Sequence, residues 1–389
     1  MLLPRARRLT PAVTLACALA AVPPLATPAS SAAVASGVTR RFIQVPYASG
    51  GRTKHLEAML VQPARTGRYP LALISHGSPR TPADRSGMAP SAYTAIATDF
   101  ARRGWASLAV MRRGYGESDG PWAEGFGTCD DPDYVKAGRA SAEDLRQAIR
   151  YVSQHADDLA EEGAAIDASR VLLVGVSAGG FASMAANALP ARETHVVGVL
   201  NFAGGRGSQE ADEVCGEDAL VEAFGEFGKT AAAPALFLYA RNDHFFGPQL
   251  ARQLFDAYRG AGGRGELVIS PAYGTDGHGQ FSELGASNWQ DDVDRFLRAH
   301  RLPTWSTPVT DPVASLQPPA GLSANGLTEF RKYLASKNVD KAFAFGGRNA
   351  WGWRTGRRSP EEAAEAAVEA CEANGATCQV YSVNNARSR

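Results

Sequence analysis

The chain has 389 residues, of which 44% are hydrophobic and 21% charged, close to the averages of globular proteins and far from those of disordered or collagen-like chains. This length is enough for one large domain and a smaller one. Lys and Arg together number 40, as do Asp and Glu, so the formal net charge is +0. Without an excess of positive charge to attract polyanions, we expect no nucleic acid as a partner.

The first 35 residues have the pattern of an export signal. Arginines near the N-terminus precede an apolar stretch from about Pro11 to Ala26, and small residues follow it. The stretch is interrupted by Pro23 and Pro24 and is shorter than the roughly 18 apolar residues that a membrane-spanning helix needs. We therefore expect removal of residues 1–35, a secreted or periplasmic mature protein, and no stable insertion into a membrane. Several small residues up to Ala35 are alternative cleavage points.

Four cysteines remain after this signal, namely Cys129, Cys215, Cys371 and Cys378. An even number suits disulfide formation in an oxidising compartment. Three pairings are open, and the short separation of Cys371 from Cys378 favours that pair together with Cys129–Cys215. A zinc site is the alternative, but no C-x-x-C pair or nearby histidine accompanies these residues, so we expect no metal.

Residues 36–302 alternate short apolar runs with helical patterns, which predicts a doubly wound α/β fold with a mostly parallel sheet. A capping box at 141–144 predicts a helix start, and further helices are expected at 178–188, 248–261 and 288–300. Eight strands are expected, at 41–46, 55–61, 71–75, 105–111, 171–176, 196–202, 235–240 and 266–270.

The composition changes at residues 303–320, where prolines recur among Ser and Thr, which is typical of a stiff linker. Residues 321–389 are expected to form a small α+β accessory domain containing a disulfide. Its elements are a helix at 327–336, a hairpin of 342–345 with 351–353, a helix after Ser359 and a strand at 378–383. Trp351, Trp353 and the nearby arginines are candidates for a cell-wall or glycan contact, although tryptophans that fill the small core are an equal alternative.

The most specific motif is G-x-S-x-G at 175–179, which follows the apolar run 171–174 and precedes a helical pattern. In this motif the serine lies on a sharp turn between strand and helix, and the glycines let the two elements approach closely. A glycine-rich turn without function is the alternative, but the strand before and the helix after favour a catalytic serine. Ser177 is the predicted nucleophile.

A serine hydroxyl needs an imidazole to accept its proton and a carboxylate to orient that imidazole. Asp243 follows the predicted strand 235–240, and His278 lies in a glycine-flanked loop after the last predicted strand. His244 is a weaker candidate base because it adjoins Asp243. Asp276 is a rival acid, although a carboxylate two residues before the histidine is more typical of a turn.

An oxyanion hole requires two backbone N–H groups that point at the developing negative charge. Ala178, directly after the nucleophile, is one predicted donor, and Gly77 or Ser78, in the loop after the strand 71–75, is the other. His76 is then expected to brace this loop. Two long insertions, 121–133 and 204–226, are expected to shape the pocket.

Residues from roughly 40 to 300 resemble bacterial dienelactone hydrolase-like proteins of the α/β-hydrolase superfamily. The resemblance rests on His76-Gly77, R-G-Y-G-E-S at 113–118, G-V-S-A-G-G at 175–180, Asn242-Asp243 and Gly277-His278. Dienelactone hydrolases themselves have a cysteine nucleophile, so Ser177 makes the chain more similar to serine esterases and to the catalytic domains of prolyl-oligopeptidase-type peptidases. The resemblance implies an α/β-hydrolase fold that hydrolyses a small-molecule carboxylic ester, lactone or amide without a metal or organic cofactor.

The expected function is a secreted serine hydrolase that acts on esters or lactones. A secreted peptidase of the prolyl-oligopeptidase type is one alternative. Such peptidases usually carry a large N-terminal propeller, whereas only about forty residues precede the first predicted strand. A non-catalytic binding protein with a hydrolase fold is the other alternative, and the complete set of Ser177, Asp243 and His278 argues against it.

Overall fold

The computed structural model of the chain describes residues 37–161, 163–309 and 314–388. The predicted export signal, residues 1–35, lies outside the described residues. Within them, no helix combines the length and the apolar character that crossing a membrane requires.

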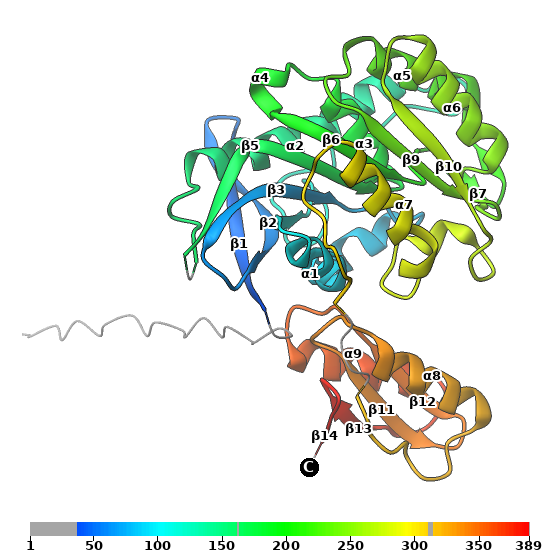
Figure 1. The fold of residues 1–389 in the computed structure, drawn as a ribbon. Helices are drawn as coiled ribbons and strands as arrows, with labels where there is room; N and C mark the ends of the chain where they lie inside the picture. The colour runs from blue at the N-terminus through cyan, green and yellow to red at the C-terminus, as the bar shows by residue number, and fades with distance from the viewer. Residues whose placement is uncertain (1–36, 162, 310–313, 389) are drawn as a thin grey trace, which may run out of the picture. The chain divides into compact units, whose positions relative to one another are not determined.

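A large sheet of eight strands forms the centre of the first part of the chain (Figure 1). All eight predicted strands are present. In spatial order they are β1 (Val38–Ser49), β2 (Arg52–Pro63), β4 (Ala106–Val110), β3 (Gly67–Ser75), β5 (Ala164–Val176), β6 (Val196–Phe202), β9 (Ala235–Ala240) and β10 (Gly265–Ser270). Two of the neighbouring pairs are antiparallel, β1 with β2 and β2 with β4, and the remaining pairs are parallel.

Helices cover both faces of this sheet, so two hydrophobic cores form, one on each side. One core takes side chains from α2 (Tyr134–Gln154), α3 (Ala178–Asn187), α5 (Glu217–Thr230) and α6 (Pro248–Gly260). The other takes side chains from α1 (Thr94–Arg102) and α7 (Ala286–Ala299). Burial on both faces explains why the inner strands are continuous apolar runs.

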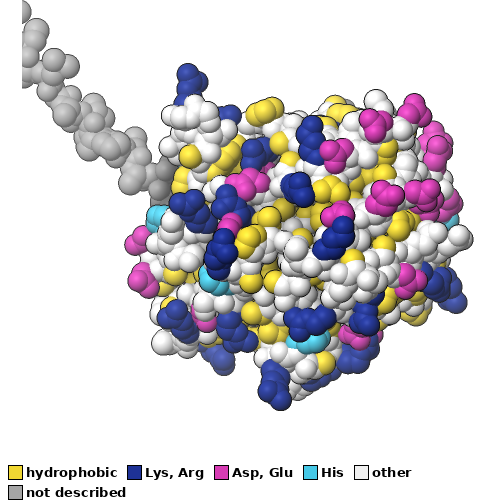
Figure 2. All heavy atoms as spheres, turned by 90° about the horizontal axis from the view of Figure 1, so that it is seen from above, with side chains coloured by type: hydrophobic (Ala, Val, Ile, Leu, Met, Phe, Trp, Pro, Cys, Tyr) yellow, Lys and Arg dark blue, Asp and Glu magenta, His cyan; other side chains and the backbone are white. Residues whose placement is uncertain are grey.

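Short elements complete this part of the chain. They are the 3₁₀ helices η1 (Pro82–Gly87), η2 (Pro90–Tyr93) and η3 (Gly277–Gln280), the helix α4 (Ala191–Thr194), and a small hairpin of β7 (Ser208–Glu210) and β8 (Glu213–Val214). On the face shown in Figure 2, basic and acidic side chains are interspersed, in keeping with the balanced charge of the sequence.

One predicted helix start is wrong. Helix α2 begins at Tyr134 rather than at the capping box 141–144, and its N-cap is Asp133, whose carboxylate accepts a hydrogen bond from the backbone N–H of Lys136. Ser141 lies inside the helix, where its hydroxyl donates to the carbonyl of Ala137. The sequence pattern was misleading because a serine in a helix interior can satisfy its hydroxyl on the preceding turn.

A separate four-stranded antiparallel sheet with two helices follows near the C-terminus. Ser359 caps α9 (Pro360–Glu372), as predicted. The disulfide Cys371–Cys378 joins the end of α9 to the residue before β13 (Gln379–Val383). Trp351 and Trp353 are partly buried against the small core, which supports the core-filling alternative for them. The elements are α8 (Ala324–Ala335), β11 (Ala342–Gly347), β12 (Ala350–Arg354), α9 (Pro360–Glu372), β13 (Gln379–Val383) and β14 (Ala386–Arg387).

The first residues of the predicted linker are held in place. The indole N–H of Trp105 donates to the carbonyl of Pro303 at 2.9 Å, and the indole N–H of Trp305 donates to Asp294 at 2.9 Å. The chain therefore leaves α7 along the surface of the large sheet's helices before it reaches the C-terminal elements.

Candidate active site

Ser177 occupies the turn between β5 and α3, where its backbone has φ +55° and ψ −124°. A side-chain-bearing residue rarely adopts a positive φ, and such strain persists only where the surroundings impose it. Here the N–H of Ser177 donates to the carbonyl of Phe202 at 2.9 Å, and its own carbonyl accepts from Phe181 at 3.0 Å. The neighbouring strand and the following helix thus fix the serine on the turn.

Glycines make this turn possible. A Cβ atom on Gly175 would lie 2.1 Å from the carbonyl oxygen of Gly179, and one on Gly179 would lie 2.1 Å from that of Ser75. Any larger residue at either position would push the helix away from the strands. The predicted mechanical role of the two motif glycines agrees with this packing.

Asp243 and His278 lie together at the carboxyl end of the sheet. The Nδ1 atom of His278 is 3.1 Å from Oδ2 of Asp243 and 3.2 Å from its Oδ1. The Asp243 carboxylate is 2% exposed and also accepts hydrogen bonds from the backbone N–H groups of Phe245 and Phe246 at 2.8 and 2.9 Å. These bonds hold the carboxylate so that it can orient the imidazole.

The rival residues have other contacts. Oδ1 of Asp276 accepts from the backbone N–H of His278 at 2.9 Å, so this carboxylate caps η3, as its turn-like sequence position predicted. The imidazole of His244 is paired with Asp212 at 3.0 Å on the surface. The partly exposed His244–Asp212 pair and the capping role of Asp276 both favour Asp243 as the residue that orients His278.

The loop after β3 lies beside the nucleophile. A Cβ atom on Gly77 would be 3.3 Å from Cβ and 3.8 Å from Oγ of Ser177. Ala178 begins α3, where backbone N–H groups have no partner within the helix. Gly77 is thus next to Ser177, Ala178 directly follows it, and Ser78 lines the same cavities as Ser177; their role as oxyanion donors stays a prediction.

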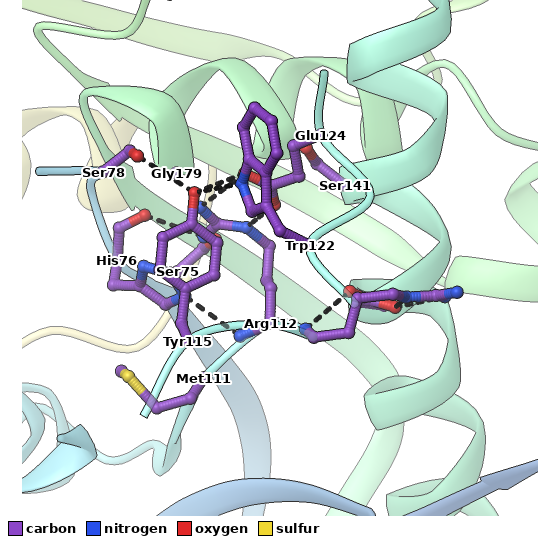
Figure 3. A network of polar contacts seen from close by, with 12 residues as sticks. Ser75, His76, Ser78, Met111, Arg112, Tyr115, Trp122, Glu124, Ser141 and Gly179 are labelled. Atoms are coloured by element: carbon purple, nitrogen blue, oxygen red, sulfur yellow. Dashed lines mark hydrogen bonds and ion pairs between the residues drawn. The ribbon is translucent and has the colours of Figure 1, made fainter. Parts of the chain in front are cut away.

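A buried ionic network contacts this loop (Figure 3). Arg112 and Arg206 both donate to the carboxylate of Glu124, and the side chains of Arg112 and Glu124 are fully buried. Another nitrogen of Arg112 donates to Ser75 Oγ at 2.8 Å and to the carbonyl of His76 at 2.7 Å. Burial opposes ionisation of Glu124, but the two guanidinium groups outweigh it and hold the pKa of that carboxyl well below its usual range.

His76 braces the loop, as expected. Its Nε2 accepts from the backbone N–H of Arg112 at 3.0 Å, and its Nδ1 is 2.6 Å from the carbonyl of Gly77. Burial and the charge of Arg112 lower the pKa of His76 well below its usual value, so the ring stays neutral with the proton on Nδ1. The buried position leaves the ring in a structural role.

The two disulfides join the cysteines in the pairing favoured from sequence, Cys129 with Cys215 and Cys371 with Cys378. The first links the two insertions, 121–133 and 204–226. Tyr134 adds a contact at the same point, because its hydroxyl donates to the carbonyl of Cys215. The insertions are therefore tied together next to the site.

Ser177 lines two adjoining cavities. A narrow pocket of about 180 Å³ runs between the insertions, and Trp122, Phe126 and Arg206 line it. A wider cleft of about 750 Å³ also includes His278, Gly77 and Phe281. In the described residues, no group of three or more His, Cys, Asp or Glu side chains is arranged to hold a metal ion.

A stack of three side chains forms the wall between the cavities. The ring of Phe245 lies parallel to the imidazole of His278, with centroids 3.9 Å apart, and the guanidinium of Arg80 lies 3.7 Å from the centroid of Phe245. This stack and the Arg112–Glu124–Arg206 network were not predicted. Their members come from separate segments of the chain and follow no spacing rule.

No protein-family model matches the chain, and none of the curated proteins matches it by sequence. Its structure is similar to that of a candidate dienelactone hydrolase of Klebsiella pneumoniae, with 16% identity, a TM-score of 0.46, and coverage of 68% of this chain and 98% of that one. An esterase of Pyrococcus furiosus has 13% identity and a TM-score of 0.44, with coverage of 67% and 90%. Esterase 2 of Thermogutta terrifontis has 18% identity and a TM-score of 0.45, with coverage of 67% and 94%.

The chain's own topology identifies its fold. The helix-covered sheet has the order β1-β2-β4-β3-β5-β6-β9-β10, and the serine of G-x-S-x-G stands on the turn from β5 to α3. By this strand order and this turn, the chain has the fold of the α/β-hydrolase superfamily.

Proposed function

We propose that this chain is a secreted serine hydrolase that cleaves carboxylic esters or lactones through an acyl-enzyme on Ser177. The observation that carries the proposal is the arrangement at one cleft of a serine on a strained turn and a histidine that is bonded to a buried aspartate. That combination of residue types and positions is what activation of a serine hydroxyl requires.

In the proposed first step, Oγ of Ser177 attacks the acyl carbon while Nε2 of His278 accepts its proton. The Asp243 carboxylate keeps the other ring nitrogen, Nδ1, protonated and stabilises the imidazolium. The backbone N–H of Ala178 and that of Gly77 or Ser78 receive the negative charge on the carbonyl oxygen. The intermediate then collapses, and His278 passes the proton to the departing alcohol.

In the second step, water attacks the acyl-enzyme with His278 again as the base, which releases the acid and restores Ser177. For a lactone, the alcohol and the acid belong to one molecule, so a single hydroxy acid is released. Apart from the substrate and this water, every group that takes part in the two steps is a side chain or backbone amide of the chain.

Export is part of the proposal. The pattern of residues 1–35 and the two disulfides support an oxidising, extracytoplasmic location. The C-terminal elements follow the catalytic region in the same chain, and we propose boundaries of 36–302 for the catalytic domain, 303–320 for the linker and 321–389 for the accessory domain.

Labelling by a fluorophosphonate tests the nucleophile, because only an activated serine reacts rapidly. We expect labelling of the wild type, none of Ser177→Ala, and unchanged labelling of Ser153→Ala, whose side chain is exposed on α2. Hydrolysis of a series of p-nitrophenyl esters, measured beside aminoacyl-anilides, then separates an esterase from a peptidase. Rapid labelling of Ser177 with cleavage of anilides alone would favour the peptidase, and absence of labelling would favour a binding protein.

A further inference from the structure

The wide cleft at Ser177 is lined partly by the C-terminal elements. Arg357, in the segment between β12 and α9, belongs to its wall together with His278 and Ser177. About 80 residues separate Arg357 from His278 in sequence, and the resemblance to hydrolases ends near residue 300. The chain's last part thus contributes a cationic side chain to the candidate active site.

The neighbouring residue, Arg358, anchors this segment. Its guanidinium donates to both oxygens of Glu57, at 2.7 and 3.0 Å, and to the carbonyl of Met88 at 2.9 Å. Glu57 lies on β2 and is 3% exposed. A bidentate pair with a buried carboxylate fixes both the position and the orientation of an arginine. The backbone at position 357 is therefore held in place next to the cleft.

Further bonds hold the same face. Arg40 on β1 pairs with Asp340 at 2.8 Å, with both side chains buried. The hydroxyl of Ser91 donates to the carbonyl of Gly356 at 2.8 Å. Gly356 has a φ of +66°, and a Cβ atom there would lie 2.7 Å from Cα of Ala92. This glycine lets the backbone that precedes Arg357 lie directly against η2.

Arg357 itself has spare hydrogen-bonding capacity. Its Nε atom is buried without a hydrogen-bond partner, and its nearest carboxylate oxygen, on Glu362, is 3.9 Å from Nη1. The other charged side chains of the cleft are Arg80 and Asp84. Arg80 is already engaged, since it stacks on Phe245 and donates to Ser208 at 3.0 Å. Arg357 is thus the cleft's available guanidinium.

The position of His278 indicates which part of a substrate meets Arg357. His278 must deliver a proton to the leaving oxygen, so the alcohol part of an ester lies on the side of the imidazole. His278 and Arg357 line the wide cleft but not the adjoining narrow pocket of about 180 Å³, which Ala178 lines. The acyl part then occupies the narrow pocket, and the alcohol part occupies the cleft.

We propose that Arg357 is a specificity residue which binds an anionic group, such as a carboxylate, on the alcohol part of the ester. This inference rests on the proposed esterase function. The C-terminal elements are then part of the substrate site, held there by Arg358, and the alcohol that they select carries a negative charge a short distance from the ester oxygen.

The test compares 3-acetoxybenzoate with its neutral methyl ester, methyl 3-acetoxybenzoate, using the full-length protein and following release of the phenol. Both have the same acyl group and the same phenolic leaving oxygen. We expect Arg357→Gln to lower the ratio of kcat/KM for the anionic over the neutral substrate about tenfold, as removal of a charged hydrogen bond typically does. Arg348→Gln, on the exposed turn before β12, is the matched control and keeps the wild-type ratio.

Arg358→Gln provides a second arm, because it keeps the Arg357 side chain but removes its anchor. We expect it to lower the same ratio, with KM rather than kcat affected. A change of less than twofold in the ratio for Arg357→Gln, while the wild type cleaves both esters, overturns the inference and leaves the esterase proposal intact. Failure of the wild type to cleave either ester, with no labelling of Ser177, refutes the proposed function instead.

Discussion

Substitution of Glu124 by Gln should destabilise the protein more than any other single change of charge near the site. Glu124 accepts from Nε and Nη2 of Arg112 and from Nη2 of Arg206, and all three side chains are almost completely buried. A glutamine keeps one acceptor oxygen but removes the negative charge, so two buried guanidinium groups would face each other without compensation.

The magnitude follows from the burial of the network. Removing one partner of a buried ion pair typically costs about 3 to 5 kcal/mol of unfolding free energy. Each kcal/mol lowers Tm by roughly 2 to 4 °C in a domain of this size, so a decrease of roughly 6 to 20 °C is expected. Activity should decrease as well, because Arg112 also positions the carbonyl of His76 in the loop that carries Gly77.

Differential scanning calorimetry of the wild type and Glu124→Gln between pH 8 and 5 measures this difference. The pKa of Glu124 in the folded state lies below its ordinary value of 4.5, so its contribution to stability is fully present above that value and is lost only as the pH falls toward the lowered pKa. The decrease in Tm should therefore be constant over this range.

Glu226→Gln is the matched control, since Glu226 is half-exposed and its ion pair with Lys229 lies on the surface. Such pairs contribute about 0 to 1 kcal/mol. A decrease of less than 2 °C for Glu124→Gln, or one no larger than for Glu226→Gln, would refute the account of the network given above.

Three further outcomes are expected. Asp243→Asn should reduce kcat by several orders of magnitude. Asp276→Asn should cause a far smaller loss of kcat, because the Asp276 carboxylate caps a turn. Steady-state kinetics with the reverse ranking would contradict the assignment of the acid. Replacing Cys129 and Cys215 by Ser opens a loop whose ends are 86 residues apart and should cost roughly 4 to 5 kcal/mol in the chain-entropy model, with a higher KM because the tied insertions form the narrow pocket. Burial lowers the pKa of Lys341 to about 8. Between that pH and the ordinary pKa of 10.5, the unfolded chain binds more protons than the folded one, so the free energy of unfolding should rise with pH. If a Lys341→Met variant showed the same pH slope in urea titrations, Lys341 would not be the source of this rise.

The large sheet was predictable because parallel strands covered by helices on both faces must be apolar throughout. The run 196–202 coincides with β6, and 235–240 coincides with β9. Strands β1 and β2 extend several residues beyond the predicted ends. Residues 52–54 of β2 are polar and pair with the end of β1, so this part of the hairpin leaves no apolar signal. Helix α5 was not predicted; it begins inside the insertion 204–226 and extends beyond it to Thr230.

The candidate site was predictable where chemistry and backbone geometry impose a local pattern. Ser177 needs glycines on either side, and Asp243 and His278 each follow a strand at the same edge of the sheet. Glu124 and Arg357 have no such pattern. Their roles depend on partners that are distant in sequence, such as Arg206 for the first and the cleft around His278 for the second. Such contacts are set by tertiary packing, which composition and periodicity do not encode.

The ion pairs of Arg40 and Glu57 constrain the order in which parts of the chain can fold. Both residues lie on the first two strands, but their partners, Asp340 and Arg358, are 300 and 301 positions later. During synthesis, the first two strands therefore emerge with charges that stay unpaired until almost the whole chain is available. Contacts of such long range form late in folding. A chain shortened at its C-terminus would keep the G-x-S-x-G motif and yet leave the charges of Arg40 and Glu57 on the first two strands without their partners.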